Sequence, residues 1–253
     1  MVWLGEHVEP DWFPPVDQAL RDPPGLLAAG GDLQPTRLLA AYERGVFPWY
    51  SAQQPILWWS PDPRMVLFPN EFIISRSLRK TLRNGPYTTE VDRDFGATIR
   101  ECAAPRRSGP ETWLNADMIG AYEQLFSLGF AHSIETYRGA ELVGGLYGLR
   151  LGSIFFGESM FSRANDASKV AMARLVEECR GRGIVLIDCQ VASAHLATLG
   201  AREVSRNEFV ALLRRHARRD PNENWAQTPL PPAPENCRRG DVPRDDARRR
   251  DAP

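Results

Sequence analysis

The chain has 253 residues and a formal net charge of −1, with 43 % hydrophobic and 25 % charged residues, a composition ordinary for a globular protein. No apolar run approaches the roughly 20 residues that span a bilayer, and Met1 to Glu6 lack the basic start and apolar core of a signal peptide. We therefore expect a cytoplasmic protein with no membrane contact. The four cysteines and four histidines have no zinc, redox or HExxH spacing, so we predict no metal.

The N-terminal part is rich in turn-forming residues. Proline and glycine punctuate residues 1–34, which predicts loops and short strands. Pro35 to Arg44 is expected to form a helix that starts at its proline and stops at Gly45. The stretch from Phe47 to Arg64 is aromatic and turn-rich. We predict that residues 1–64 form a small N-terminal domain.

Regular elements follow this boundary. The pattern predicts a strand at Met65–Phe68 and helices at Ser75–Asn84, Phe95–Cys102 and Ala116–Leu128. The first of these helices, with Ser75 as its cap, carries four basic residues at helical spacing: Arg76, Arg79, Lys80 and Arg83. A phosphate-binding surface and a plain solvated helix face both account for these charges.

The centre of the chain is more regular still. Strands are predicted at 131–137, 142–149 and 152–157, then a long helix at 166–180 and an apolar strand at 184–187. Short helices are predicted at 193–199 and 208–218. Residues 65–218 are therefore expected to form one domain. Residues 219–253 combine clustered prolines with mixed charges and almost no apolar residues, which predicts a disordered tail.

Hairpins, then a helix, then a buried strand, is the core order of the acyltransferase fold called GNAT. We therefore predict an α+β fold with a mixed central sheet flanked by helices. An acetyl-coenzyme A enzyme of this fold needs a glycine-rich turn before the long helix, where backbone N–H groups hold the pyrophosphate. The turn here, 161–166, contains no glycine. The sequence therefore predicts the fold without its usual cofactor.

Asp188, Cys189 and Gln190 end the predicted apolar strand, where open α/β sheets place functional groups. Side chains alternate along a strand, so Asp188 and Gln190 should share a face and Cys189 should point away. A carboxylate beside a carboxamide can orient an amine and help to remove its proton. Asp188 as a helix cap and Gln190 as a surface residue fit the spacing equally well. Cys189 is expected to be a packed residue, because nothing places His195 against it.

Glu158 lies in the apolar run from Phe155 to Ser162, where a carboxylate needs a partner. A cationic substrate and a structural arginine are equally compatible with it. Met160 suits either an apolar pocket or plain core. The tryptophans at 49, 58, 59 and 113 occupy turn-rich segments, where they could stack on nucleotide bases or fill the join between the two domains.

Together these segments resemble the leucyl/phenylalanyl-tRNA–protein transferases over about residues 13–215. The resemblance is carried by 25–27 (GLL), 30–33 (GGDL), 44–49 (RGVFPW), 57–64 (LWWSPDPR), 132–135 (HSIE), 142–148 (LVGGLYG), 157–162 (GESMFS) and 186–190 (LIDCQ). It implies transfer of Leu or Phe, and Met less well, from aminoacyl-tRNA to proteins beginning with Arg or Lys. These products enter the bacterial N-end rule degradation pathway.

The resemblance also implies roles for particular residues. Asp188 and Gln190 would orient and help to deprotonate the incoming amine, with Glu158 as their acidic neighbour. Trp49 and Trp113 would contact the terminal adenosine of the tRNA. Leu146, Met160 and Ile187 would line the pocket for the transferred side chain. The helix with Arg76, Arg79, Lys80 and Arg83 would hold the acceptor stem through its phosphates.

An aminoacyl ester is already activated, so no ATP, metal or coenzyme A is expected, and we expect a monomer. Two other functions fit parts of the sequence: an acetyl-coenzyme A-dependent acetyltransferase, and an RNA-binding module without enzymatic activity. A sister class of transferases adds Leu to N-terminal Asp or Glu. Glu158 and Asp188 would repel such acidic acceptors, which favours Arg or Lys.

Overall fold

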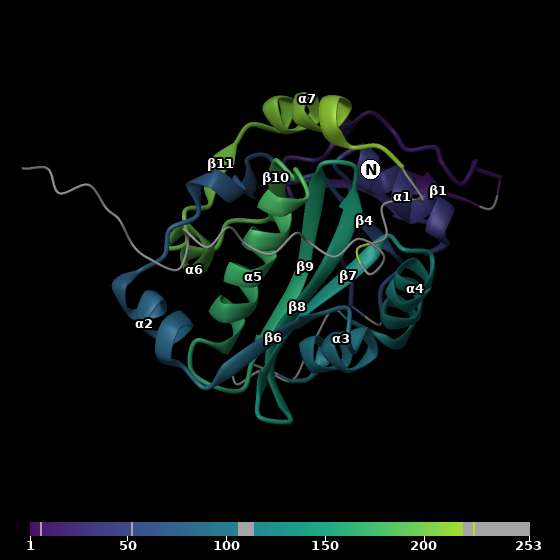
Figure 1. The fold of residues 1–253 in the computed structure, drawn as a ribbon. Coiled ribbons are helices and arrows are strands. Elements are labelled where there is room, and N and C mark those ends of the chain that lie inside the picture. Colours follow the sequence, from purple (N-terminus) through teal and green to yellow (C-terminus); the bar gives the residue numbers. More distant parts are fainter. Residues whose placement is uncertain (6, 52, 106–113, 220–224, 226–253) are drawn as a thin grey trace, which may run out of the picture.

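The computed structural model describes residues 1–5, 7–51, 53–105, 114–219 and 225, and its strands form two sheets (Figure 1). The smaller sheet belongs to the N-terminal part. Its strands, in spatial order, are β1 (Val2–Leu4), β2 (Leu26–Gly30), β4 (Leu57–Trp59) and β3 (Phe47–Pro48). Helix α1 (Pro35–Glu43) starts at its proline and is followed by Gly45 at φ +76°, as predicted. A short 3-10 turn, η1 (Val16–Gln18), precedes β2.

The larger sheet carries the predicted core order. Strands β6 (Tyr87–Val91), β7 (Ala131–Arg138), β8 (Glu141–Leu151) and β9 (Ile154–Ser162) pair antiparallel in sequence. Helix α5 (Ala167–Gly181) then leads to β10 (Leu186–Gln190), which pairs parallel to β9. Strands β5 (Arg64–Leu67) and β11 (Arg202–Val204) complete the sheet beyond β10. The predicted α+β fold with a mixed sheet is confirmed.

Helices cover both faces of this sheet (Figure 1). Successive residues of one strand belong to different hydrophobic cores, as Phe155 and Phe156 illustrate, because side chains alternate between the two faces. One core holds α3 (Phe95–Ala103), α4 (Ala116–Ser127) and α7 (Arg206–His216), and the other holds α2 (Arg76–Asn84) and α5. The 3-10 turn η2 (Pro69–Glu71) and α6 (Ala194–Ala197) are short connectors. No helix in the described part of the chain could cross a membrane.

The two predicted domains share the first of these cores. It runs without a break from Leu4 and Leu38, in the N-terminal part, to Tyr122 on α4 and Phe209 on α7. The predicted boundary at Arg64 coincides with the first residue of β5, in the large sheet. The N-terminal part is therefore packed against the sheet, close enough to contribute side chains to a site on it.

The predicted tail lies mostly outside the described residues, but two of its residues are placed. Arg219 forms an ion pair with Glu43 at 2.8 Å. Trp225 is 2 % exposed and stacks on the His132 ring with centroids 4.6 Å apart, while the Arg182 guanidinium lies 5.0 Å from the indole centroid. Trp225 therefore completes the core between the sheet and α5.

Candidate active site

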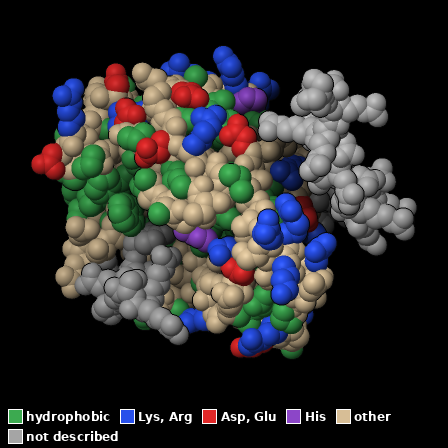
Figure 2. Space-filling view, turned by 90° about the vertical axis from the view of Figure 1, so that its left-hand side faces the viewer, with side chains coloured by type: hydrophobic (Ala, Val, Ile, Leu, Met, Phe, Trp, Pro, Cys, Tyr) green, Lys and Arg blue, Asp and Glu red, His purple; other side chains and the backbone are tan. Residues whose placement is uncertain are grey.

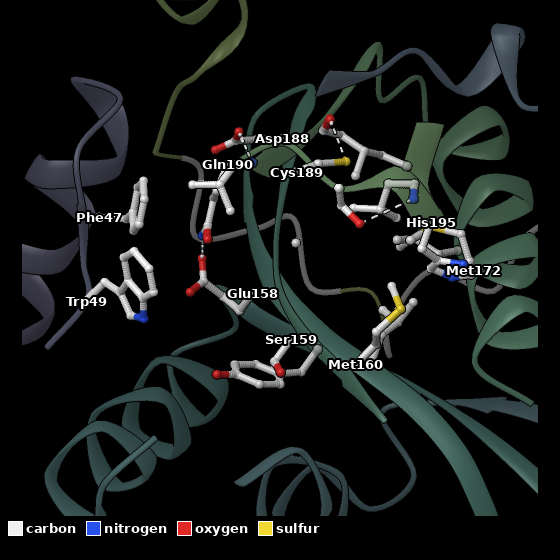
Figure 3. A pocket seen from close by; sticks show the side chains of 18 of the residues that line it. Phe47, Trp49, Glu158, Ser159, Met160, Met172, Asp188, Cys189, Gln190 and His195 are labelled. Atoms are coloured by element: carbon white, nitrogen blue, oxygen red, sulfur yellow. Dashed lines mark hydrogen bonds between the residues drawn. The ribbon is translucent and has the colours of Figure 1, made fainter. Parts of the chain in front are cut away.

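The candidate site lies where β9 and β10 part. The two parallel strands pair as far as Phe156 and Asp188. Beyond this point Gln190 of β10 lies opposite Met65 of β5, whereas β9 stays paired with β8 through Ser162. A cavity of about 510 Å³ opens between the diverging ends, with walls from β8 and α5 and a rim from residues 47–49 (Figure 3). The break in pairing therefore turns side chains of both strands toward one cavity.

One end of the cavity is apolar. The structure brings together the three residues predicted to line a side-chain pocket, Leu146, Met160 and Ile187. They belong to the core that also contains α5. Sequence reasoning missed further apolar lining residues, among them Met172, Leu175 and Leu196. This end therefore suits an apolar side chain.

The other end is built on a buried ion pair between Asp188 and Arg64. Arg64 Nε and Nη2 donate to the two carboxylate oxygens of Asp188 at 2.8 and 2.6 Å. The Arg64 side chain is 1 % exposed and that of Asp188 is 0 % exposed. The backbone N–H of Gln190 donates to the same carboxylate at 2.9 Å. Gln190 has φ +64°, a left-handed conformation that needs such support in a residue with a side chain. Asp188 therefore fixes the backbone from which Gln190 projects.

Gln190 and Glu158 form the polar surface of the cavity (Figure 3). Gln190 Nε2 donates to Glu158 Oε1 at 2.7 Å, and the two residues are 8 % and 9 % exposed, respectively. A carboxylate only accepts hydrogen bonds, so the amide nitrogen must face it and the amide oxygen must face elsewhere. No described donor occupies that oxygen, which leaves it available to a ligand with an N–H group.

Glu158 Oε2 accepts a second hydrogen bond, from the hydroxyl of Tyr122 at 2.9 Å. The Tyr122 hydroxyl is in turn 2.6 Å from that of Tyr42 on α1. Burial raises the pKa of Glu158 to about 7, against the opposing effect of the two hydroxyls, which stabilise the charged form. A carboxyl with this pKa can accept and return protons near neutral pH.

Cys189 points away from Asp188 and Gln190 (Figure 3), as strand alternation predicted. Its thiol lies 3.8 Å from the carbonyl of Ile187. Burial raises the pKa of the Cys189 thiol above its ordinary value, because the thiolate is poorly solvated. Burial also lowers the pKa of His195, helped by Lys169. Neither group has the environment of an activated nucleophile and its base.

Trp49 stands at the mouth of the cavity and is 44 % exposed. Its backbone carbonyl accepts a hydrogen bond from Trp59 Nε1 at 2.6 Å, and the two rings lie 5.8 Å apart. Trp58, by contrast, is buried and donates to the Gly30 carbonyl, so it is a packing residue. Trp113, predicted to act with Trp49, lies outside the described residues. An exposed indole beside a polar cavity can stack on a planar ligand.

Helix α2 carries the predicted basic residues on its surface. Arg76, Arg79, Lys80 and Arg83 are all exposed, and none forms an ion pair with another residue that the structure describes. Figure 2 shows the side of the molecule that lies on the left in Figure 1, where α2 is labelled. Lys and Arg side chains gather on the lower half of that side, at the height of α2. Uncompensated charges on one helix face are suited to binding a polyanion.

The turn before α5 does not fit coenzyme A. Residues 163–166 contain no glycine, and Asp166 adopts φ +61° at the start of the helix. Its carboxylate pairs with Lys169 at 2.7 Å. An acidic side chain at the helix N-terminus disfavours a pyrophosphate there. The absence of the usual cofactor of the fold at this turn stays a prediction, based on these residues.

Two family models match the chain: leucyl/phenylalanyl-tRNA protein transferase over residues 66–214, and the N-terminal domain of the same family over residues 31–62. The transferase of this name from Pseudomonas entomophila is 57 % identical over 215 residues, covering 85 % of this chain and 95 % of the relative. That of Nitrosospira multiformis is 58 % identical over 197 residues, covering 78 % and 85 % respectively.

Among solved structures, a GCN5-related N-acetyltransferase from Kribbella flavida aligns with 11 % identity and a TM-score of 0.39, covering 68 % of this chain and 61 % of that chain. This likeness is too distant to bear on activity. The family matches and the relatives are decisive, since they span both the N-terminal part and the large sheet. The chain therefore belongs to the leucyl/phenylalanyl-tRNA protein transferase family of aminoacyltransferases.

Proposed function

We propose that this protein moves Leu or Phe, and Met less well, from aminoacyl-tRNA to the N-terminal Arg or Lys of proteins, which marks them for degradation by the bacterial N-end rule pathway. The observation that carries the proposal is the division of one cavity into an apolar end and an end with Glu158 and Gln190. A cavity of this kind can hold an apolar aminoacyl group beside an incoming amine.

The apolar end would receive the side chain of the transferred residue. Leu146, Met160 and Ile187 are flexible or branched aliphatic residues that can pack against either Leu or Phe. Trp49 at the mouth would stack on the terminal adenosine, which positions the ester over the cavity. A charged or strongly polar side chain would lose its hydration at this end without gaining a partner.

The polar end would receive the acceptor amine. The Gln190 amide oxygen would accept a hydrogen bond from the amine, and Glu158 would accept the proton that the ammonium must lose before attack. The nitrogen lone pair then forms a bond to the ester carbonyl carbon, the bond from that carbon to the ribose oxygen of the tRNA breaks, and the ribose oxygen takes up the second proton that the nitrogen loses on becoming an amide. Because the ester is already activated, positioning and proton transfer are what the protein must supply.

Asp188 would act through Gln190. Both of its oxygens are bound to Arg64, one also accepts the Gln190 N–H, and the side chain is fully buried. The proposal therefore gives Asp188 the task of holding Gln190 in its left-handed conformation. Both carboxylates line the cavity, but the oxygens of Asp188 are taken up by Arg64, so the negative charge of Glu158 would favour Arg or Lys at the acceptor terminus over Asp or Glu.

A transfer assay tests the proposal. The purified protein is mixed with labelled leucyl-tRNA and with peptides that begin with Arg, Lys, Asp or Ala and are otherwise identical. We expect label on the Arg and Lys peptides alone. Equal labelling of the Asp peptide would refute the proposed acceptor, and labelling of no peptide would refute the transfer itself.

Helix α2 is proposed to bind the tRNA acceptor stem. Replacing Arg76 and Arg79 with alanine should weaken leucyl-tRNA binding and reduce the slope of log K against log salt by about one for each arginine. Turnover at saturating tRNA should hardly change, because the helix does not line the cavity. Binding titrations over a series of salt concentrations measure the slope.

Helix α7 provides the matched control for this prediction. Arg214 and Arg215 are also exposed arginines near the end of a helix. Their replacement by alanine removes the same charge from the protein. An equal loss of slope in the two double variants would show that net charge, and not the position of α2, governs tRNA binding.

A further inference from the structure

We propose that Tyr42 and Tyr122 are positioning residues for the transfer reaction: their hydroxyls form a buried hydrogen-bond chain that holds Glu158 as the proton acceptor. The inference rests on the proposed function, in which Glu158 takes the proton of the amine. It assigns to the N-terminal part, through Tyr42 of α1, a share in the chemistry of the large sheet.

The order of donors in the chain follows from proton counting. Tyr122 has one hydroxyl proton, and it donates that proton to Glu158 Oε2 at 2.9 Å. While Glu158 is ionised and accepts from Tyr122, the 2.6 Å contact between the two tyrosine hydroxyls has Tyr42 as the donor and Tyr122 as the acceptor. Both tyrosines are 0 % exposed, so water does not replace either bond. The chain thus points toward the carboxylate, and Tyr42 acts both through the bond that Tyr122 makes and by lowering the pKa of Glu158 itself.

The carboxylate is held from both sides. Gln190 Nε2 donates to Oε1 at 2.7 Å, while Tyr122 donates to Oε2. Each carboxylate oxygen can accept two hydrogen bonds, so one position on each remains for an incoming proton. The two donors fix the rotamer of Glu158 while leaving it able to react.

The groups that face Glu158 come from every element packed against it. Tyr42 lies on α1, Tyr122 on α4, Tyr147 on β8, Asp188 on β10 and Arg64 on β5. Burial raises the pKa of Glu158 to about 7, the two hydrogen-bonded tyrosines lower it, Asp188 raises it and Arg64 lowers it. Removing a hydroxyl of the chain should therefore raise this pKa further, because the charged form loses a donor.

Tyr147 provides a matched control within the same cluster. It is 0 % exposed, and its ring packs edge-on against Tyr122 with centroids 5.4 Å apart. Its hydroxyl, however, has no hydrogen-bond partner among the described residues. Replacing Tyr147 with phenylalanine removes a buried hydroxyl from this core without removing a link of the chain.

The experiment compares the wild type with Tyr122→Phe, Tyr42→Phe and Tyr147→Phe. The rate of Leu transfer from saturating leucyl-tRNA to a peptide that begins with Arg is measured between about pH 6 and 9. The acidic limb should move to higher pH by about one unit in Tyr122→Phe and also in Tyr42→Phe, because both hydroxyls stabilise the charged form of Glu158. Tyr147 lines the cavity, so the absolute rate can change in Tyr147→Phe, but its acidic limb should stay at the wild-type pH because no hydrogen bond to Glu158 is removed. Titration of the substrate amine is common to all four proteins, so the differences report on the enzyme.

A second measurement keeps the inference separate from the proposed function. Carbon-13 NMR of protein labelled at the glutamate carboxyls follows the titration of Glu158, which is assigned by its loss in Glu158→Gln. Its pKa should rise in Tyr122→Phe and stay unchanged in Tyr147→Phe. Unshifted pKa values in Tyr122→Phe and Tyr42→Phe would overturn the hydrogen-bond chain even if transfer is observed. Absence of transfer in the wild type would refute the proposed function instead, and with it the role of the chain in transfer, whatever the NMR titration gives.

Discussion

Replacing Arg64 with methionine should reduce the free energy of unfolding by about 3–5 kcal/mol, because it leaves the fully buried carboxylate of Asp188 without its partner. A typical domain has a total stability of about 5–15 kcal/mol, so the variant should be only marginally folded. The urea midpoint of unfolding measures the change. Transfer activity should fall as well, since Asp188 also holds the backbone of Gln190.

Arg64 has this weight because it connects three parts of the molecule. Its guanidinium donates to Asp188 in the large sheet and to the Gly45 carbonyl in the N-terminal part. It also lies 4.7 Å from the ring centroids of both Phe47 and Phe209, so that aromatic faces pack against the planar group. Methionine can fill part of the volume, but it provides none of the donors.

Two further variants identify the cause of the loss. In the double variant Arg64→Met with Asp188→Asn no buried charge is left, so it should recover part of the stability lost in Arg64→Met. Arg100→Met breaks an exposed ion pair with Glu123 and should leave the midpoint nearly unchanged. If Arg64→Met proved as mild as Arg100→Met, the ion pair with Asp188 would not be the support that its geometry indicates.

The sequence pattern predicted which residues form the site better than it predicted the residues that bind them. Alternation along one strand was enough to set Cys189 apart from Asp188 and Gln190, because the period of side chains in a strand is local information. The partner of Asp188 lies 124 residues away in the chain. Nothing local in either segment specifies that pairing, so an arginine partner could be considered only in general terms, and then for Glu158.

Glu158 shows a second limit of local pattern. A strand was predicted to end at Gly157, yet β9 continues to Ser162 and pairs with β8 on both sides of a register shift at Glu158. The carboxylate is tolerated within the strand because Tyr122 and Gln190 donate to it. Tyr122 lies inside the helix predicted at Ala116–Leu128, and nothing in that prediction gave it a role in the site. Its hydroxyl acquires a role through tertiary contacts that helical periodicity does not encode.

Edge strands were the least predictable elements. Neither β6 nor β11 was predicted, since Tyr87–Val91 and Arg202–Val204 are short and carry polar residues. Strand β10 was predicted at the right place but two residues early, at 184–187 instead of Leu186–Gln190. The apolar residues Ile184 and Val185 belong to the turn after α5, where their N–H groups bond to Cys179 and Ser153. Ile184 is buried at that turn whereas Val185 is exposed, so their hydrophobicity does not reflect strand pairing.

Replacing Glu158 with glutamine should lower the rate of transfer by about 10²- to 10⁴-fold, the usual contribution of a positioned general base. The amide has nearly the same shape but cannot take up the proton of the amine at neutral pH. The part of the acidic limb that reflects ionisation of Glu158 near pH 7 should disappear with it, which leaves only the titration of the substrate amine. Affinity for leucyl-tRNA should change little. Single-turnover rates at saturating tRNA and a separate binding titration distinguish the two effects.

Loss of folding would not explain such a result. Because burial raises the pKa of Glu158 to about 7, the folded protein binds this proton more tightly than the unfolded chain does. The Glu158 carboxyl therefore lowers the free energy of unfolding progressively as pH rises from its ordinary pKa to about 7. Above that range Glu158→Gln removes a buried charge, so the variant should not be less stable on this account.

Glu135 on β7 is the matched control: it is fully buried, its pKa is raised by burial, and it does not line the cavity. Glu135→Gln should transfer Leu at nearly the wild-type rate. A comparable loss of transfer rate in Glu135→Gln and Glu158→Gln would mean that burial of a carboxyl in this sheet governs activity, and not its position at the cavity.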